Sequence, residues 1–302
     1  MPETLNQDWI NWHYELTSLI NGDFSSRKAR LASEIFPNLI FKKQALLFSE
    51  IQIKNSNNSI NYGEKNLIRL PPINSEIESI LAMKSYLQNY LKNDLVCAVL
   101  HGSLGSEEAV NYSDFDGLVI IKKAVLENAE KLARVAKQLY LSRRYMYMHD
   151  PLQHHGWFVL PEQALSAWDE NYFPIEILRH SKHLMNDDEF KLRIINSKVK
   201  LESHFNLNQI LDSIEKQFSS GNYITNLYQL KSFNSKILLI PALIIQAKTG
   251  SGVFKKTSFT MAKKIMPPDA WQVIVSATEL RTNWHKIEMI GSKRLLTRPG
   301  IL

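Results

Sequence analysis

The sequence predicts an α/β (α+β) fold, with a small mixed or antiparallel sheet flanked by helices and followed by a C-terminal helical domain. Two short apolar runs, 95–100 and 115–122, have the length and composition of strands. Longer stretches with apolar residues at helical spacing surround them and continue beyond residue 200. Hydrophobic residues make up 44% of the 302 residues, which is enough for a packed core.

Three regions follow from these patterns. Residues 1–72 are expected to form an N-terminal helical and irregular extension, residues 73–190 the α/β core, and residues 191–302 a basic helical domain. The chain is long enough for one large domain or two of ordinary size. No internal repeat or low-complexity segment stands out.

The N-terminal region is the least informative part of the chain. A helix is expected to begin near Trp9 and to end at Asn21-Gly22. Trp9 and Trp12 share its apolar face, so packing in the core is favoured over stacking on a ligand. Residues 24–72 indicate no clear role, and the polar stretch 54–65 favours a loop or an exposed hairpin.

The core is expected to begin with a helix over residues 75–92, for which Ser75 is a plausible cap. A buried strand should follow at 95–100, and a second strand at 115–122. A Gly-Ser turn stands between the two strands.

A helix is then expected over residues 125–141. Two extended segments should follow, 145–149 and 153–160, with Pro151 enforcing a break between them. Pro161 is expected to begin another helix, because proline is tolerated in the first turn.

Beyond residue 200 the pattern is helical. We expect helices over 207–218 and over 224–248, the second one bent at Pro241. A short basic helix should follow over 258–266, and Asp269 is expected to cap the last helix.

The charge of the chain is uneven. The net charge is +6, yet residues 236–302 hold eleven Lys and Arg against three acids, or +8. The rest of the chain is therefore about −2. A basic region of this kind suits triphosphate or nucleic-acid binding, and a solvated basic face explains it equally well.

Targeting and redox features indicate a soluble, cytoplasmic protein that does not bind membranes. The start of the chain has no apolar stretch typical of a signal peptide. The longest apolar run, 237–247, is too short to span a bilayer. Cys97 is the only cysteine, which excludes an internal disulfide and a cysteine-based zinc site.

The most informative segment runs from His101 to Ile121. Gly102 and Ser103 form a Gly-Ser turn, and Asp114 and Asp116 follow at the opening of the second strand. In a strand, residues i and i+2 point the same way, so we expect both carboxylates to project together. Two adjacent carboxylates repel each other unless a cation lies between them. Mg²⁺ is a suitable cation, since it binds a few carboxylates together with phosphates and water.

This combination of strand, Gly-Ser turn, fixed gap and Asp-x-Asp resembles the nucleotidyltransferase superfamily with the DNA polymerase beta-like catalytic core. The resemblance covers residues 95–121 and extends weakly to about residue 190. It implies that Asp114 and Asp116 are catalytic and hold Mg²⁺ (or Mn²⁺). It also implies nucleotide binding, such as ATP binding, by the Gly-Ser turn. In that turn Gly102 lets the backbone approach the phosphates, and Ser103 offers its hydroxyl group and amide.

The sequence departs from this family at the third catalytic carboxylate, which normally lies on a later strand. The corresponding segment, 153–158, contains no acid. His154 or His155 can take its place, since a neutral imidazole can bind a metal or accept a proton. Adjacent strand residues face opposite ways, so we expect at most one of the two to face the site. Ordinary structural roles for both histidines remain open.

Four further residues are expected to help bind the nucleotide. Ser113 precedes the acids and can orient one of them. Lys255, Lys256 and Ser258 follow a glycine-rich turn, and related enzymes often bring basic residues from a helical domain onto the triphosphate. A solvated pair of lysines is an equally good interpretation.

The leading hypothesis is a metal-dependent nucleotidyltransferase that moves a nucleoside monophosphate from a triphosphate to an acceptor hydroxyl. The acceptor could be a small molecule, a tRNA or another RNA, or a protein. One alternative is a catalytically degenerate module that senses nucleotides, which the missing acid favours. Another is a nucleic-acid-binding protein that uses the basic helical region. The sequence indicates neither the base nor the acceptor nor the oligomeric state.

Overall fold

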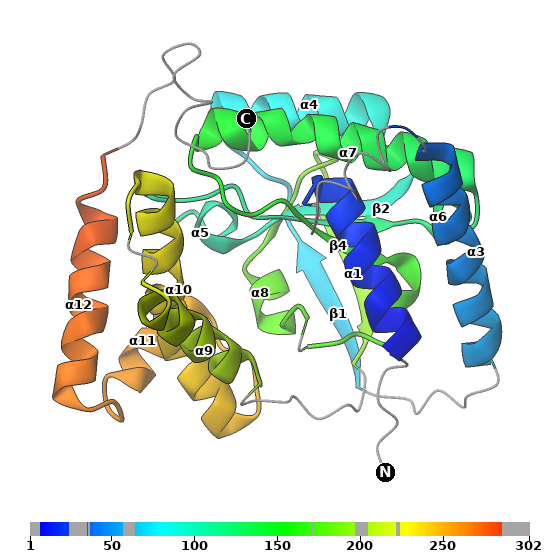
Figure 1. The fold of residues 1–302 in the computed structure, drawn as a ribbon. Coiled ribbons are helices and arrows are strands. Elements are labelled where there is room, and N and C mark those ends of the chain that lie inside the picture. Colours follow the sequence, from blue (N-terminus) through cyan, green and yellow to red (C-terminus); the bar gives the residue numbers. More distant parts are fainter. Residues whose placement is uncertain are drawn as a thin grey trace.

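The computed structural model describes residues 7–23, 35, 37–56, 64–170, 172–196, 205–221 and 224–285. Helices and short strands alternate in the first two thirds of the chain, and helices alone follow in the described part beyond residue 200 (Figure 1).

Two small sheets form the centre of the fold. The larger has the strand order β4 (Trp157–Pro161), β3 (Gly117–Ile121), β2 (Leu95–Leu100) and β5 (Lys182–His183). Its β3–β4 pair is parallel, and β2 is antiparallel to both β3 and β5. The smaller sheet is the antiparallel pair β1 (Lys65–Leu70) and β6 (Phe190–Ile195). The predicted fold class, α/β (α+β) with a small mixed sheet and C-terminal helices, is therefore confirmed.

Apolar residues alternate between the two faces of the central strands, as the period of two requires. One face of β2 and β3 packs against helices on the side of α7 (Figure 1). These helices are α1 (Gln7–Asn21), α3 (Pro37–Ser56), α4 (Glu78–Tyr90) and α7 (Ala129–His149). The other face, which includes Cys97, Val99, Leu118 and Ile120, packs against the smaller sheet and α8 (Ile175–Arg179).

The open edge of β4 is covered by side chains that replace a neighbouring strand. Asn21 Oδ1 accepts a hydrogen bond from Trp157 N–H at 2.7 Å, and its Nδ2 donates to Trp157 O at 2.8 Å. Farther along, His13 Nε2 lies 2.5 Å from Val159 O, and Tyr172 Oη accepts from Val159 N–H at 3.3 Å. The end of α1 is thereby fixed against the sheet, because these backbone groups find no ladder partner on this side.

The C-terminal helices form a separate apolar cluster on the other side of the sheet from α3 (Figure 1). They are α9 (Phe205–Ser219), α10 (Leu227–Thr249), α11 (Lys255–Ala262) and α12 (Pro268–Thr282). Buried Leu238 and Ile274 lie in this cluster. Tyr112 of the core also packs here, with its ring edge-on to Trp284 at 5.2 Å between ring centres.

By length and composition alone, α10 is the one helix among the described residues that could cross a membrane. In this structure α10 packs against α9, α11 and α12, as a core helix does. Its Lys231 side chain is fully buried in ion pairs with the core.

Several predicted elements are confirmed. α1 ends at Asn21, and Gly22 follows with a φ of +66°. β2 matches the predicted strand. α9 and α10 also match their predicted helices, with Pro241 inside α10.

The segment after β3 differs from its prediction. A short α6 (Lys123–Leu126) comes first, and Asn128 then caps α7 by accepting a hydrogen bond from Lys131 N–H. Residues 145–149 are helical rather than extended, because no helix breaker precedes Pro151. Residues 153–156 lie outside any strand. Pro161 ends β4 and is followed by a 3₁₀ helix, η1 (Glu162–Ser166).

The two predicted caps are also wrong. Ile77 is the N-cap residue of α4, and Ser75 Oγ accepts instead from Ile77 N–H at 3.2 Å. Pro267 occupies the N-cap position of α12, so Asp269 lies in the first turn.

The unassigned N-terminal stretch contributes a helix and a strand to the core. α3 extends to Ser56, so the predicted loop or hairpin over 54–65 begins in a helix and ends at the first residue of β1. The rest of it, 57–63, lies outside the described residues. The three-region division remains a prediction, and the β1–β6 pair joins its first region to its third.

Candidate active site

The Gly-Ser turn and the second aspartate are in direct contact. Gly102 begins the short helix α5 (Gly102–Gly105) with a φ of +64°, a conformation that side chains rarely tolerate. A Cβ atom at this position would lie 2.2 Å from Asp116 Oδ2. The backbone N–H of His101 also donates to Asp116 O at 2.9 Å. Only glycine therefore lets the turn approach the acid this closely.

The acid pair precedes β3 instead of lying within it. β3 begins at Gly117, so the strand alternation that we used to place Asp114 and Asp116 does not apply to them. The backbone between the two acids is held by the Gln153 side chain. Gln153 Oε1 accepts from Phe115 N–H at 2.8 Å, and Nε2 donates to Phe115 O at 3.1 Å. The residue between the two acids is thus clamped on both sides.

Asp114 is paired with a buried lysine from the C-terminal helices. Lys231 Nζ lies 2.5 Å from Asp114 Oδ1 and 2.5 Å from Asp150 Oδ2, and the lysine side chain is fully buried. The main chain around it is fixed by Tyr112, whose hydroxyl donates to Lys231 O at 2.6 Å. An ion triad of this kind joins α10, the end of α7 and the acid segment.

The pKa values of the acids follow from this arrangement. Burial alone raises the pKa of Asp114, but His154 and Lys231 outweigh it and hold that pKa well below its ordinary value. Burial and the charge of Asp114 raise the pKa of Asp116. Burial raises the pKa of Asp150 to about 6, against the opposing charge of Lys231. The two neighbouring aspartates therefore differ in their affinity for a proton.

Lys231 keeps its charge in spite of burial. Burial lowers its pKa, but the carboxylates of Asp114 and Asp150 more than compensate and raise it. The ammonium group also lies 5.0 Å from the centre of the Tyr112 ring, within reach of a cation–π interaction.

Ser103 and Ser113 form the other wall of the turn. Ser103 Oγ donates to Ser113 Oγ at 2.8 Å, and Ser113 Oγ accepts from Val110 N–H at 2.9 Å. Ser113 is buried, so it ties the loop before the acids to the Gly-Ser turn. Its hydroxyl accepts from Ser103 and Val110, and the predicted role in orienting an acid remains a prediction.

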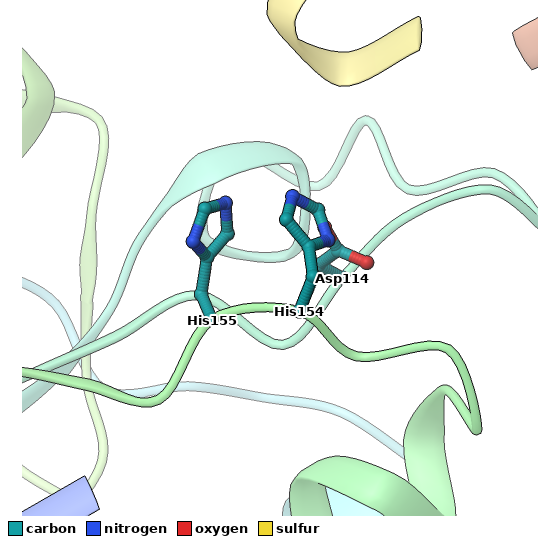
Figure 2. A group of neighbouring side chains, drawn as sticks. All are labelled: Asp114, His154 and His155. Atoms are coloured by element: carbon teal, nitrogen blue, oxygen red, sulfur yellow. The ribbon is translucent and has the colours of Figure 1, made fainter. Parts of the chain in front are cut away.

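The two histidines lie side by side and point the same way (Figure 2). Their ring centres are 3.8 Å apart. We expected adjacent histidines to face opposite ways, which is wrong here because residues 153–156 are not in a strand. His154 Nδ1 lies 3.0 Å from Asp114 Oδ2, and His155 is exposed. Both rings therefore stand at the acid pair.

Of the predicted basic residues, Lys255 interacts electrostatically with the two aspartates. It begins α11, and its charge is close enough to affect the pKa values of Asp114 and Asp116. Its side chain reaches water, yet the protein that surrounds its ammonium group, together with Arg281, lowers its pKa to about 8. A lysine in this position can form an ion pair with a negatively charged ligand.

Lys256 and Ser258 point elsewhere. Lys256 Nζ donates to Glu108 Oε1 at 2.8 Å on the surface. Ser258 is buried, and its hydroxyl donates to Lys255 O at 2.5 Å. Ser258 thus stabilises the first turn of α11. Their predicted contacts with a nucleotide remain predictions.

Sequence reasoning missed Lys231 and Gln153. Lys231 shares one face of α10 with buried Asn234 and Leu238, at helical spacing. A lysine on an otherwise buried face was the available sign, because a buried ammonium needs an acid partner. Gln153 gave no comparable sign, since its role depends on the way the chain folds back onto Phe115.

The residues present can hold a divalent cation. One ligand atom each from Asp114, His154 and His155 lies within 4.8 Å of the other two. Asp116 is not in this group, although it lies close enough to Asp114 for the charge of Asp114 to raise the pKa of Asp116. Carboxylate oxygen and imidazole nitrogen are both ordinary metal ligands.

Comparison with known proteins gives only a distant likeness. No protein-family model matches the chain, and no curated protein matches it. Among solved structures, it is similar to the crystal structure of spectinomycin adenyltransferase AAD(9) from Enterococcus faecialis with ATP and spectinomycin. The TM-score is 0.40 at 16% identity, over 73% of this chain and 95% of that chain.

Proposed function

We propose that this protein transfers a nucleoside monophosphate from a nucleoside triphosphate to an acceptor hydroxyl group, with the help of a divalent metal ion. In this reaction the acceptor oxygen attacks the α-phosphorus, the bond to the bridging oxygen breaks, and pyrophosphate leaves. The hydroxyl group gives its proton to a base at the site or to water. The protein has to bind the triphosphate, align the acceptor and offset growing negative charge.

The observation that carries this proposal is the contact between Gly102 and Asp116. A glycine with a φ of +64° leaves room for the Asp116 carboxylate directly over the turn. The turn offers backbone and hydroxyl groups for phosphate oxygens, and the acids offer oxygens for a metal. A phosphate-binding turn in contact with an acid pair is the arrangement that a metal–triphosphate complex requires.

Each group at the site has a role under this proposal. Asp114 and Asp116 hold the metal, with His154 or His155 in place of the absent third acid. Gly102 and Ser103 bind phosphate oxygens. Lys255 adds positive charge beside the acids, which suits a triphosphate. The metal, when bound, neutralises charge on the phosphates and favours ionisation of the attacking hydroxyl.

A second function is a nucleotide-sensing module without catalysis, and one observation favours it. Asp114 already has a positive partner, because Lys231 holds its Oδ1 at 2.5 Å. No acid replaces the third carboxylate on the segment 153–158. Such a module would bind a triphosphate but release no pyrophosphate. A nucleic-acid-binding function would instead depend on the basic C-terminal region and show a steep loss of affinity with salt.

Thermal unfolding with each of the four ribonucleoside triphosphates, with and without Mg²⁺ or Mn²⁺, tests the proposed site. A ligand at one hundred times its Kd stabilises the folded state by about 2.7 kcal/mol. We expect a metal-dependent rise in Tm for wild type and its loss in Asp116→Asn. Asp188→Asn, an exposed acid away from the site, should keep the rise. An equal rise in Asp116→Asn would contradict the proposal.

A further inference from the structure

We infer that Asp114, His154 and His155 form a binding site for a transition-metal ion that prefers imidazole nitrogen, instead of an all-oxygen Mg²⁺ site. The inference concerns the same site as the proposed function and rests on that function for its use. The metal itself can be tested with no nucleotide present.

The donor atoms are the first argument. Two imidazoles and one carboxylate offer ligand atoms within 4.8 Å of one another. Mg²⁺ binds oxygen ligands and keeps much of its water, whereas imidazole suits Zn²⁺, Fe²⁺, Co²⁺ and Ni²⁺. Two histidines and one carboxylate leave several coordination positions open, and these could accept phosphate oxygens.

A buried ring nitrogen of His154 faces Asp114. His154 Nδ1 is buried and has no hydrogen-bond partner among the described residues, although it lies 3.0 Å from Asp114 Oδ2. Two ligand atoms at right angles, each about 2.1 Å from one metal, are about 3 Å apart. The pair is therefore spaced as neighbouring ligands of a metal.

The metal-binding donor atoms are held in place by neighbouring side chains. Lys231 fixes Oδ1 of Asp114 and leaves Oδ2 facing His154. Gln153 Nε2 donates both to Phe115 O at 3.1 Å and to His155 O at 2.9 Å. One amide thus joins the acid segment to the histidine segment. Figure 2 shows the resulting placement of the two rings beside Asp114, with both side chains pointing the same way. Ligands that are already positioned lose less freedom when they bind a metal.

The experiment titrates metal-free, full-length protein with Co²⁺, whose visible absorption reports imidazole ligation, and then adds excess Mg²⁺. We expect one Co²⁺ to bind and to resist a hundredfold excess of Mg²⁺. His154→Ala and His155→Ala should each weaken Co²⁺ binding at least tenfold. His285→Ala removes an exposed histidine outside the group and should leave binding unchanged. Displacement by Mg²⁺, or unchanged binding in either site variant, would overturn the inference.

Pulsed EPR of Cu²⁺, which also prefers imidazole ligands, bound to wild type gives a second test that requires no variant. We expect two directly coordinated nitrogens, and none would overturn the inference. Thermal unfolding with triphosphates distinguishes this outcome from failure of the proposed function. A triphosphate-dependent rise in Tm without nitrogen ligation removes only the inference. Nitrogen ligation without any effect of triphosphates upholds it and removes the proposed function.

Discussion

Single residues determine how the site is built, and Gly102 is the clearest case. Its positive φ and its contact with Asp116 are separate constraints on the side chain at this position. Gly221 offers a natural comparison, because its φ is +66° and nothing lies within 4 Å of a Cβ atom there. The two glycines therefore share the conformational constraint and differ in the steric one.

Gly102→Ala should lower the free energy of unfolding and abolish the metal-dependent effect of triphosphates on Tm. The added methyl group forces Asp116 away from the turn, and the positive φ costs about 1 kcal/mol besides. Gly221→Ala should also lower the free energy of unfolding, because of the positive φ alone, and should keep the effect of triphosphates on Tm. Urea denaturation and thermal unfolding measure both quantities. Retained nucleotide stabilisation in Gly102→Ala would contradict the steric account.

Lys231→Met should destabilise the protein by about 3–5 kcal/mol at pH 7, because it leaves two buried carboxylates without their cation. The deficit should shrink at pH 5, since burial already raises the pKa of Asp150 to about 6 and loss of Lys231 raises it further. Urea denaturation at both pH values measures this difference.

Lys248→Met is the matched control, because Lys248 is exposed in the last turn of the same helix. It should change the unfolding free energy by less than about 0.5 kcal/mol at either pH. A deficit of Lys231→Met that is independent of pH would argue against the ion triad as its cause.

The acid pair and the Gly-Ser turn were predictable at this scale, because all their residues lie within one short stretch of the sequence. The partners of the buried lysine were not, since they lie 117 and 81 residues away in sequence. The same holds for the clamp on Phe115, whose partner follows 38 residues later. Contacts of this kind depend on how whole elements pack.

At the scale of elements, local patterns located the strands and most helices but not every boundary. β2 was predictable from one apolar run bounded by polar residues. The end of α7 was not, because the aromatic and methionine residues of 145–149 fit a strand as well as a helix. That boundary matters for function. The continued helix places Asp150 at its C-cap, where it meets Lys231.

β5 contains a buried histidine that should make the protein sensitive to acid. His183 packs on Phe190, and neither ring nitrogen has a hydrogen-bond partner within the described part of the chain. Burial, and then the charge of Lys84, lower its pKa from 6.5 to about 4. Between these values the unfolded chain binds a proton that the folded protein does not. Stability therefore falls as the pH drops through this window.

His183→Leu should remove this part of the acid sensitivity. For wild type, the contribution of His183 to the unfolding free energy should decrease by about 3 kcal/mol between pH 7.5 and pH 4. Over the same pH range, the unfolding free energy of His183→Leu should therefore fall by about 3 kcal/mol less than that of wild type. His180→Leu, which changes an exposed histidine, should behave like wild type. Equal pH dependence in His183→Leu and wild type would contradict the prediction.

At the scale of the whole molecule, the C-terminal helices contribute charged side chains to the proposed site. Lys231 of α10 holds Asp114, Lys255 of α11 acts on both acids, and Lys256 pairs with Glu108 next to the Gly-Ser turn. The uneven charge of the sequence indicated a basic region but not which lysines reach the acids. One of the decisive lysines, Lys231, lies before the segment that carries the excess charge.

The most direct test of the central claim identifies which bond of the triphosphate breaks. The protein is incubated with an α-labelled triphosphate, Mg²⁺, Mn²⁺ or Co²⁺, and either polyhydroxyl small molecules or RNA as acceptor. Our account predicts release of pyrophosphate, transfer of the label to one acceptor class, and loss of both in the Asp114→Asn/Asp116→Asn double variant. Release of inorganic phosphate alone, or undiminished pyrophosphate release by the double variant, would contradict it.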